Sequence, residues 1–110
     1  MSKRVKKHLP VLRALVSLRP QERKSFLCHS SDDFILTLCE IALNVLKGNI
    51  PLSKVQFNKL KKQKRLIKLF ADKKVSLRQK RQLTQRGGFL GTLLSVAIPV
   101  ISGLLSGHKS

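Results

Sequence analysis

The side chains of this sequence that are able to do chemistry are mostly cations. The chain has 23 Lys and Arg against 5 Asp and Glu, a formal net charge of +18 over 110 residues. A charge of that size repels itself unless a polyanion lies close to it. Nucleic acid, an anionic membrane surface and an acidic protein are therefore the candidate partners.

Catalytic and metal sites are not predicted. The five acids are scattered over separate segments, with no carboxylate pair, no Ser/His/Asp arrangement and no glycine-rich phosphate loop. Cys28 and Cys39 lack CxxC spacing, so we expect reduced core residues of an intracellular protein. His8, His29 and His108 form no ligand set. The expectation is a non-enzyme without metal or cofactor.

The cations concentrate between positions 51 and 86, where 13 Lys or Arg stand against one acid, Asp72. A solvated face is the simpler interpretation, but the asymmetry favours nucleic acid. Because the chain has no Trp and no Tyr, stacking of single-stranded bases is disfavoured. We expect contacts with phosphates that do not read the base sequence, and double-stranded DNA is the first candidate partner. The predicted nucleic-acid-binding residues are Lys54, Lys59, Lys61, Lys62, Lys64, Arg65, Lys68, Lys73, Lys74, Arg78, Lys80, Arg81 and Arg86.

Five short helices are predicted to position these cations. Apolar spacing and breaks place them at residues 3–18, 21–28, 32–47, 53–71 and 77–85. Capping boxes support the last two starts, with Ser53 followed by Gln56 and Ser76 followed by Gln79. The helix over 32–47 is apolar on nearly all sides, which is typical of the centre of a bundle.

The predicted helix over 53–71 has cations along one face, since Lys61, Lys64, Arg65 and Lys68 recur at steps of three and four. Like charges at this spacing destabilise a lone helix, which indicates compensation by a bound polyanion. The residues predicted to be buried in this helix are Val55, Phe57, Leu60, Leu66, Ile67 and Phe70.

The polarity of the chain changes after Arg86, because no charged residue follows until Lys109. The apolar stretch 89–105 is slightly short for a bilayer span of about 20 residues. We expect an all-α fold, a small bundle of about five short helices followed by a Gly-Gly hinge and an apolar C-terminal helix. Residues 1–86 would form a basic nucleic-acid-binding domain and residues 87–110 an apolar tail. The tail is interpreted as a membrane anchor, a membrane-active or oligomerising peptide, or core packed onto the helical domain.

A basic run, then Arg-Gly-Gly, then an apolar tail resembles the precursor of adenovirus core protein X, the mu precursor. The resemblance covers residues 78–106 and extends to related elements such as adintoviruses and Maverick/Polinton transposons. In that family a Gly-Gly site for the viral cysteine protease separates a DNA-condensing segment from a hydrophobic piece. The candidate cleavage residues are Gln85, Arg86, Gly87, Gly88 and Phe89, with the cut before Phe89.

Two main functions follow as expectations, and a third option is an interaction module for an acidic protein. The first is a small virion core protein that binds DNA in the virion and the host nucleus, its tail contacting capsid proteins or a membrane through residues 89–105. The alternative is a tail-anchored or membrane-active protein that acts on anionic intracellular membranes.

Overall fold

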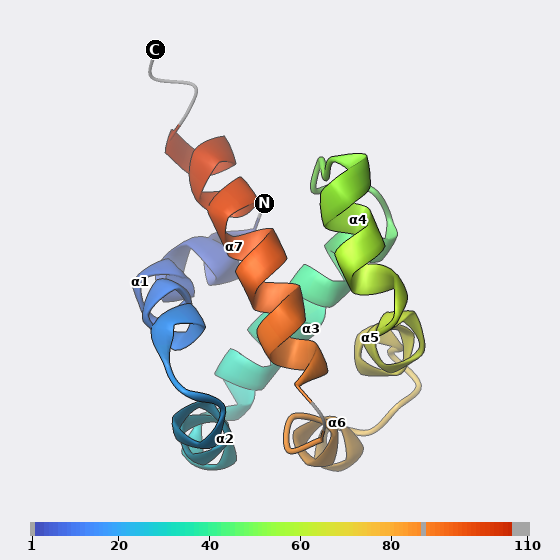
Figure 1. The fold of residues 1–110 in the computed structure, drawn as a ribbon. Helices are drawn as coiled ribbons and strands as arrows, with labels where there is room; N and C mark the ends of the chain where they lie inside the picture. The colour runs from blue at the N-terminus through green and yellow to red at the C-terminus, as the bar shows by residue number, and fades with distance from the viewer. Residues whose placement is uncertain (1, 87, 107–110) are drawn as a thin grey trace.

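The structure, a computed structural model, describes residues 2–86 and 88–106. Within these ranges the chain is all-helical, with seven helices and no strand, which confirms the all-α class. The helices are α1 (Lys3–Ser17), α2 (Pro20–His29), α3 (Asp32–Leu46), α4 (Lys54–Lys61), α5 (Lys64–Ala71), α6 (Leu77–Leu83) and α7 (Phe89–Ser106). Figure 1 shows them as one bundle, with α7 crossing in front of α3, α1 on one side, and α4 and α5 on the other.

Local sequence sets most of the helix starts. Serines precede α1, α3, α4 and α6, and each side chain accepts a hydrogen bond from a backbone N–H of the first turn. The two predicted capping boxes are confirmed, because the side-chain oxygens of Gln56 and Gln79 accept from the N–H groups of Ser53 and Ser76. Gly48 follows α3 with a positive φ of 77°, a conformation that glycine adopts without strain.

The prediction of a single helix over residues 53–71 was wrong, because the chain forms α4 and α5 with a break at Lys62 and Gln63. In one continuous helix, Gln63 and Lys64 would fall on the same face as Leu60 and Ile67 and interrupt the buried stripe. The break changes the direction of the chain, so that α4 contacts α7 while α5 contacts α3, α6 and α7.

Helix α3 lies at the centre of the bundle, as its sequence predicted. Ile35, Leu38, Ile41 and Ala42 have no exposed surface. The helix contacts α1, α5, α6 and α7, so it has neighbours on several sides and needs little polar face.

Helix α7 is buried as deeply as α3. Phe89, Leu93, Leu94, Ala97 and Ile101 are fully inaccessible to solvent. The helix contacts α1, α3, α4 and α5, and its buried residues belong to the same hydrophobic core as those of the preceding helices. The apolar stretch is therefore packed as core, the third of the three interpretations of the sequence. The predicted hinge and domain boundary include Gly87, which lies outside the described residues.

Among the residues that the structure describes, no helix meets the length and hydropathy required to cross a membrane.

Polar contacts fix α7 against the N-terminal helices. The guanidinium of Arg13 donates to the hydroxyl of Ser102 at 3.1 Å. The guanidinium of Arg23 donates to two carbonyl groups at the end of α1, at 2.9 and 3.3 Å. It also lies over Gly91, where an added Cβ would come within 2.5 Å of one of its nitrogens. A residue without a side chain at this position lets α7 approach the α1–α2 corner.

Three residues expected in the core are exposed. Val55 and Phe57 on α4 have 67% and 45% of their surface accessible, because this two-turn helix directs only Leu60 into the core. Cys28 lies exposed at the end of α2, whereas Cys39 is buried on α3, and both thiols are free. Leu60, Ile67 and Phe70 are buried as predicted.

Replacement of a core side chain of α7 should destabilise the whole domain. We expect Leu93→Ala to lower the free energy of unfolding by about 2–5 kcal/mol, because it removes buried methyl groups and leaves a cavity. Leu104→Ala, at a position 45% exposed on the same helix, should change it by less than about 0.5 kcal/mol. Urea unfolding followed by circular dichroism measures both values. Equal effects of the two substitutions would show that α7 is not part of the core.

Candidate nucleic-acid interface

The two signs of charge are segregated in the structure. Four of the five acids lie on α2 and α3, and the fifth, Asp72, follows α5. Helices α4, α5 and α6 carry only Lys and Arg as charged residues. A polyanion that approaches these three helices therefore meets cations with one acid among them.

The predicted binding residues are exposed, with two exceptions, Lys80 and Arg81. Lys80 has only 6% of its surface accessible. The Arg81 guanidinium donates to the Ser30 carbonyl at 2.8 Å and to a carboxylate oxygen of Asp32 at 2.6 Å. These contacts attach α6 to the start of α3, so both cations are held by the fold. Sequence reasoning grouped them with the surface cations because distant partners are invisible in a linear pattern.

The break between α4 and α5 brings five cations around one hollow. Its volume is about 620 Å³, and Leu69 and Asp72 complete its lining. We name the five cations the cationic corner: Lys61, Lys62, Lys64, Arg65 and Lys68. A single straight helix would have placed four of these cations in a row along one face, whereas the change of direction brings them and Lys62 around one hollow.

The cationic corner has no acid paired to its side chains in the described parts of the chain. The ion pairs of the described residues lie elsewhere: they join Asp33 to Arg4, Lys7 and His8, and Asp32 to Arg81. Asp72 lines the hollow, but its carboxylate accepts a hydrogen bond from the backbone N–H of Lys74 at 2.9 Å. The corner thus presents more positive charge than its one acid compensates.

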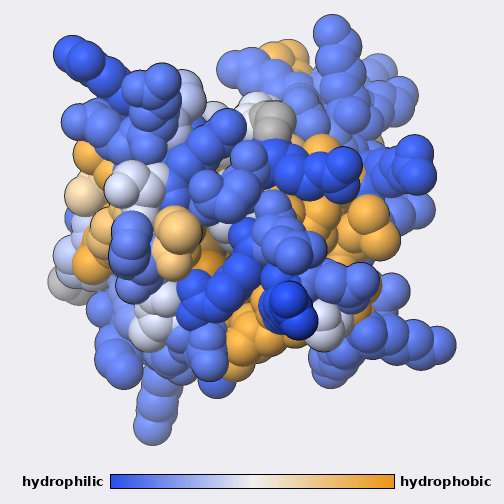
Figure 2. All heavy atoms as spheres, turned by 90° about the horizontal axis from the view of Figure 1, so that it is seen from below, coloured by the Kyte–Doolittle hydropathy of each residue, from blue (hydrophilic) through white to orange (hydrophobic). Residues whose placement is uncertain are grey.

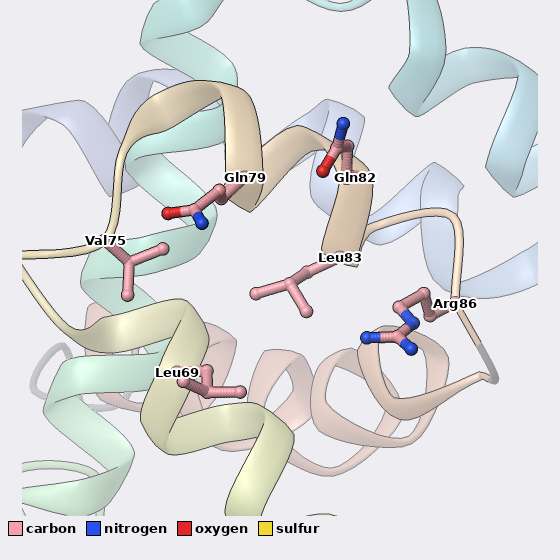
Figure 3. A pocket seen from close by; sticks show the side chains of 6 residues that line it. All are labelled: Leu69, Val75, Gln79, Gln82, Leu83 and Arg86. Carbon is pink, nitrogen blue, oxygen red and sulfur yellow. The ribbon is translucent and has the colours of Figure 1, made fainter.

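A second hollow, of about 430 Å³, lies between α5 and α6 (Figure 3). Leu69, Val75 and Leu83 point toward one another within it, and Arg86 directs its guanidinium toward Leu83 from the opposite side (Figure 3). Gln79 and Gln82 complete its lining, so Arg86 lies in a hollow of mixed polarity, apart from the five cations of the corner. Leu69 lines both hollows and is 39% exposed, which agrees with its absence from the residues predicted to be buried in this segment.

The other predicted cations lie around this region without converging. Lys54 and Lys59 are on α4, Lys73 and Lys74 are in the turn after α5, and Arg78 is on α6. The face seen from below Figure 1 is mostly hydrophilic, with apolar surface visible in patches between the polar side chains (Figure 2). The cationic surface is broad, and the hollow at the corner has more cations in its lining than the hollows that contain Arg86, Lys59 or Lys54.

The thiol of Cys39 does not add a reactive group to the site. Burial raises the pKa of the Cys39 thiol to about 11, and the charge of nearby Lys80 offsets part of that rise. The thiol is therefore protonated near neutral pH and is a poor nucleophile.

The candidate cleavage residues differ in accessibility. Gln85 and Arg86 are exposed, and Gly87 lies outside the described residues. Gly88 has a φ of 78°, and its carbonyl accepts from the N–H of Thr92 in the first turn of α7. Phe89 is fully buried against Phe70, with ring centroids 5.7 Å apart in an edge-to-face arrangement. A protease that needs an extended segment here has to unwind the start of α7.

Comparison with known proteins gave no relative: the chain matches no protein-family model, and no match was found among curated proteins or among solved structures.

Asp33 is the anion that holds the cations of α1, and its titration is testable. The hydrogen bond with His8 and the charges of Arg4 and Lys7 hold the pKa of Asp33 below its ordinary value of 3.8, although desolvation opposes them. Because this pKa is lower in the folded chain, the carboxylate stabilises the fold above pH 3.8 and loses this effect as the pH falls through the folded-state value.

We therefore expect Asp33→Asn to lower the melting temperature at pH 7, and the difference from the parent chain to disappear on acidification below the pKa of Asp33. Thermal unfolding across a pH series measures this. A difference that stays constant down to pH 2 would contradict the ionic role of Asp33.

Proposed function

We propose that this protein binds nucleic acid through non-specific contacts between its cations and the phosphates. Duplex DNA is the first candidate. The observation that carries the proposal is the cationic corner, where five cations converge around a hollow that contains one acid. Unpaired cations at this density favour a polyanion, because each contact with a phosphate releases condensed counterions.

The aromatic residues favour a duplex over a single strand. Phe34, Phe70 and Phe89 are buried in the core, and the exposed Phe26 and Phe57 do not line the cationic hollow. Phe57 lines an adjoining hollow with Lys61 and Lys64, so a single strand would find one exposed aromatic ring beside the corner, whereas sites for single strands stack several successive bases. Phosphates of a duplex need only positive charge.

The resemblance over residues 78–106 extends this proposal to a role in a virion core and in the host nucleus. Packaging DNA needs dense positive charge without sequence readout, which the exposed cations of α4, α5 and α6 provide. Processing between Gly88 and Phe89 would act on an opened or unfolded α7, because Phe89 is buried in the folded chain.

The alternative function, action on anionic membranes, needs α7 to leave the core. Helix α7 contacts four other helices, so its release would expose its own buried side chains and the core residues packed against them. Charge attraction alone could still bring the folded protein to an anionic surface.

The salt dependence of DNA binding tests the proposal. Replacement of Lys62, Arg65 and Lys68 by Gln should make the slope of log K against log salt shallower by about 2.7, from three phosphate contacts at about 0.9 each. Fluorescence anisotropy with a labelled DNA duplex, over a series of salt concentrations, gives the slope.

A matched triple variant at Lys3, Lys6 and Lys24, all exposed on α1 and α2, removes the same charge elsewhere. It should change the slope less than the corner variant. Equal losses in the two variants would show that no interface exists at the corner, and binding that is independent of salt would overturn the proposal.

Flotation tests whether α7 leaves the core, which insertion into a membrane requires. The folded chain should remain unbound to vesicles of neutral phosphatidylcholine, because its apolar helix is occupied in the core. Sedimentation or flotation of the protein with such vesicles at moderate salt measures this directly. Stable association with neutral vesicles would support the membrane alternative and would require α7 to open.

A further inference from the structure

A cluster of exposed apolar side chains lies where α3 ends and α4 begins. Leu46 and Phe57 have 37% and 45% of their surface accessible. They line a hollow of about 450 Å³ together with Pro51 and Leu52 of the connecting loop. Val45 and Ile50, which line the same hollow, are buried, whereas Leu46 and Phe57 keep apolar surface that a partner can reach.

A second, smaller hollow adjoins the first. It has a volume of about 20 Å³, which is room for about one water molecule or methyl group. Val45, Leu46 and Phe57 line both hollows, and Leu60 and Ile67 complete the smaller one. We call the two hollows together the apolar groove.

Only lysines supply charge to the apolar groove. Lys54 lines the larger hollow, and Lys61 and Lys64 line the smaller one. No acid lines either hollow. A segment that binds here must therefore be apolar where it meets Leu46 and Phe57, and anionic at its edges.

We propose that the apolar groove docks a short acidic segment of another protein, with one apolar anchor residue in the larger hollow and a second that packs over Leu46 and Phe57 at the edge of the smaller one. We choose an acidic partner because its carboxylates would be complementary in charge to the three lysines. A second copy of this chain would bring more cations to the same place. Nucleic acid would leave the apolar side chains uncovered. A bilayer favours protruding apolar side chains, whereas these line a concave surface.

This docking is coupled to the cationic corner through two shared residues. Lys61 and Lys64 line both the apolar groove and the cationic hollow. An acidic segment that contacts these lysines competes with phosphates for them. The same partner would therefore weaken binding of DNA, although docking does not depend on DNA.

The test uses a fluorescein-labelled synthetic peptide of Glu, Ala and Leu, in which the leucines recur every third or fourth residue. Such spacing places the leucines on one face of a helix. The full protein is titrated against it without DNA, at about 0.15 M salt. A peptide of the same composition with scattered leucines, and polyglutamate of the same charge, are the control probes.

Two substitutions on α3 provide a matched pair, since Leu46 and Leu36 lie on the same helix with 37% and 38% of their surface exposed. We expect Leu46→Ser and Phe57→Ser to weaken binding of the patterned peptide by about tenfold, and Leu36→Ser to leave it unchanged. Thermal unfolding of each variant verifies that it is folded. The two control probes should bind at least about tenfold more weakly than the patterned peptide.

Several results would overturn the proposal. Equal binding of polyglutamate would mean that charge alone is recognised, and equal effects of Leu46→Ser and Leu36→Ser would mean that the groove is not used. Undetectable binding of the patterned peptide would exclude an acidic occupant. Loss of binding to phosphatidylserine vesicles in the groove variants, with peptide binding unchanged, would assign the groove to a membrane surface.

Discussion

Burial of α7 is the interaction on which the rest of the structure depends. A chain with a net charge of +18 repels itself, so folding needs a large apolar contribution in a short sequence. Helix α7 provides it, since its buried side chains pack against α1, α3, α4 and α5 in one core with the other helices. Complete burial of a Leu or Phe stabilises a fold by roughly 1.5–3 kcal/mol. Because α7, which has no charged residue, supplies this apolar burial, the other helices can carry many charged residues.

Two of the five acids, Asp32 and Asp33, join helices to one another. Asp33 attaches the cations of α1 to α3, and Asp32 with the Ser30 carbonyl attaches Arg81 of α6. The charges of these two carboxylates are compensated by cations within the fold, and four of the five acids lie on α2 and α3. The surface of α4, α5 and α6 is consequently left with cations and one acid, Asp72. Two factors therefore make this surface positive: the number of its lysines, and the position of the acids on other helices.

The break between α4 and α5 produces both surfaces to which we assign a partner. It makes the cations from Lys61 to Lys68 converge around one hollow, and it leaves Phe57 exposed beside Leu46 at the end of α3. Lys61 and Lys64 belong to both surfaces. Electrostatic binding of a phosphate backbone and docking of an acidic segment are therefore alternatives at this position, since the same charges cannot compensate both.

Local features of the fold could be predicted from the sequence. The serine caps, the capping boxes at Ser53 and Ser76, the apolar pattern of α3 and the run of cations are encoded within a few residues. The sequence by itself thus determined the helical class and the cationic character of the surface. Only the tertiary structure decided that the apolar stretch after Gly88 is core, that Lys80 and Arg81 are held by the fold, and that Phe57 is exposed. These outcomes depend on contacts between residues far apart in the chain, because burial and pairing are properties of neighbours in space.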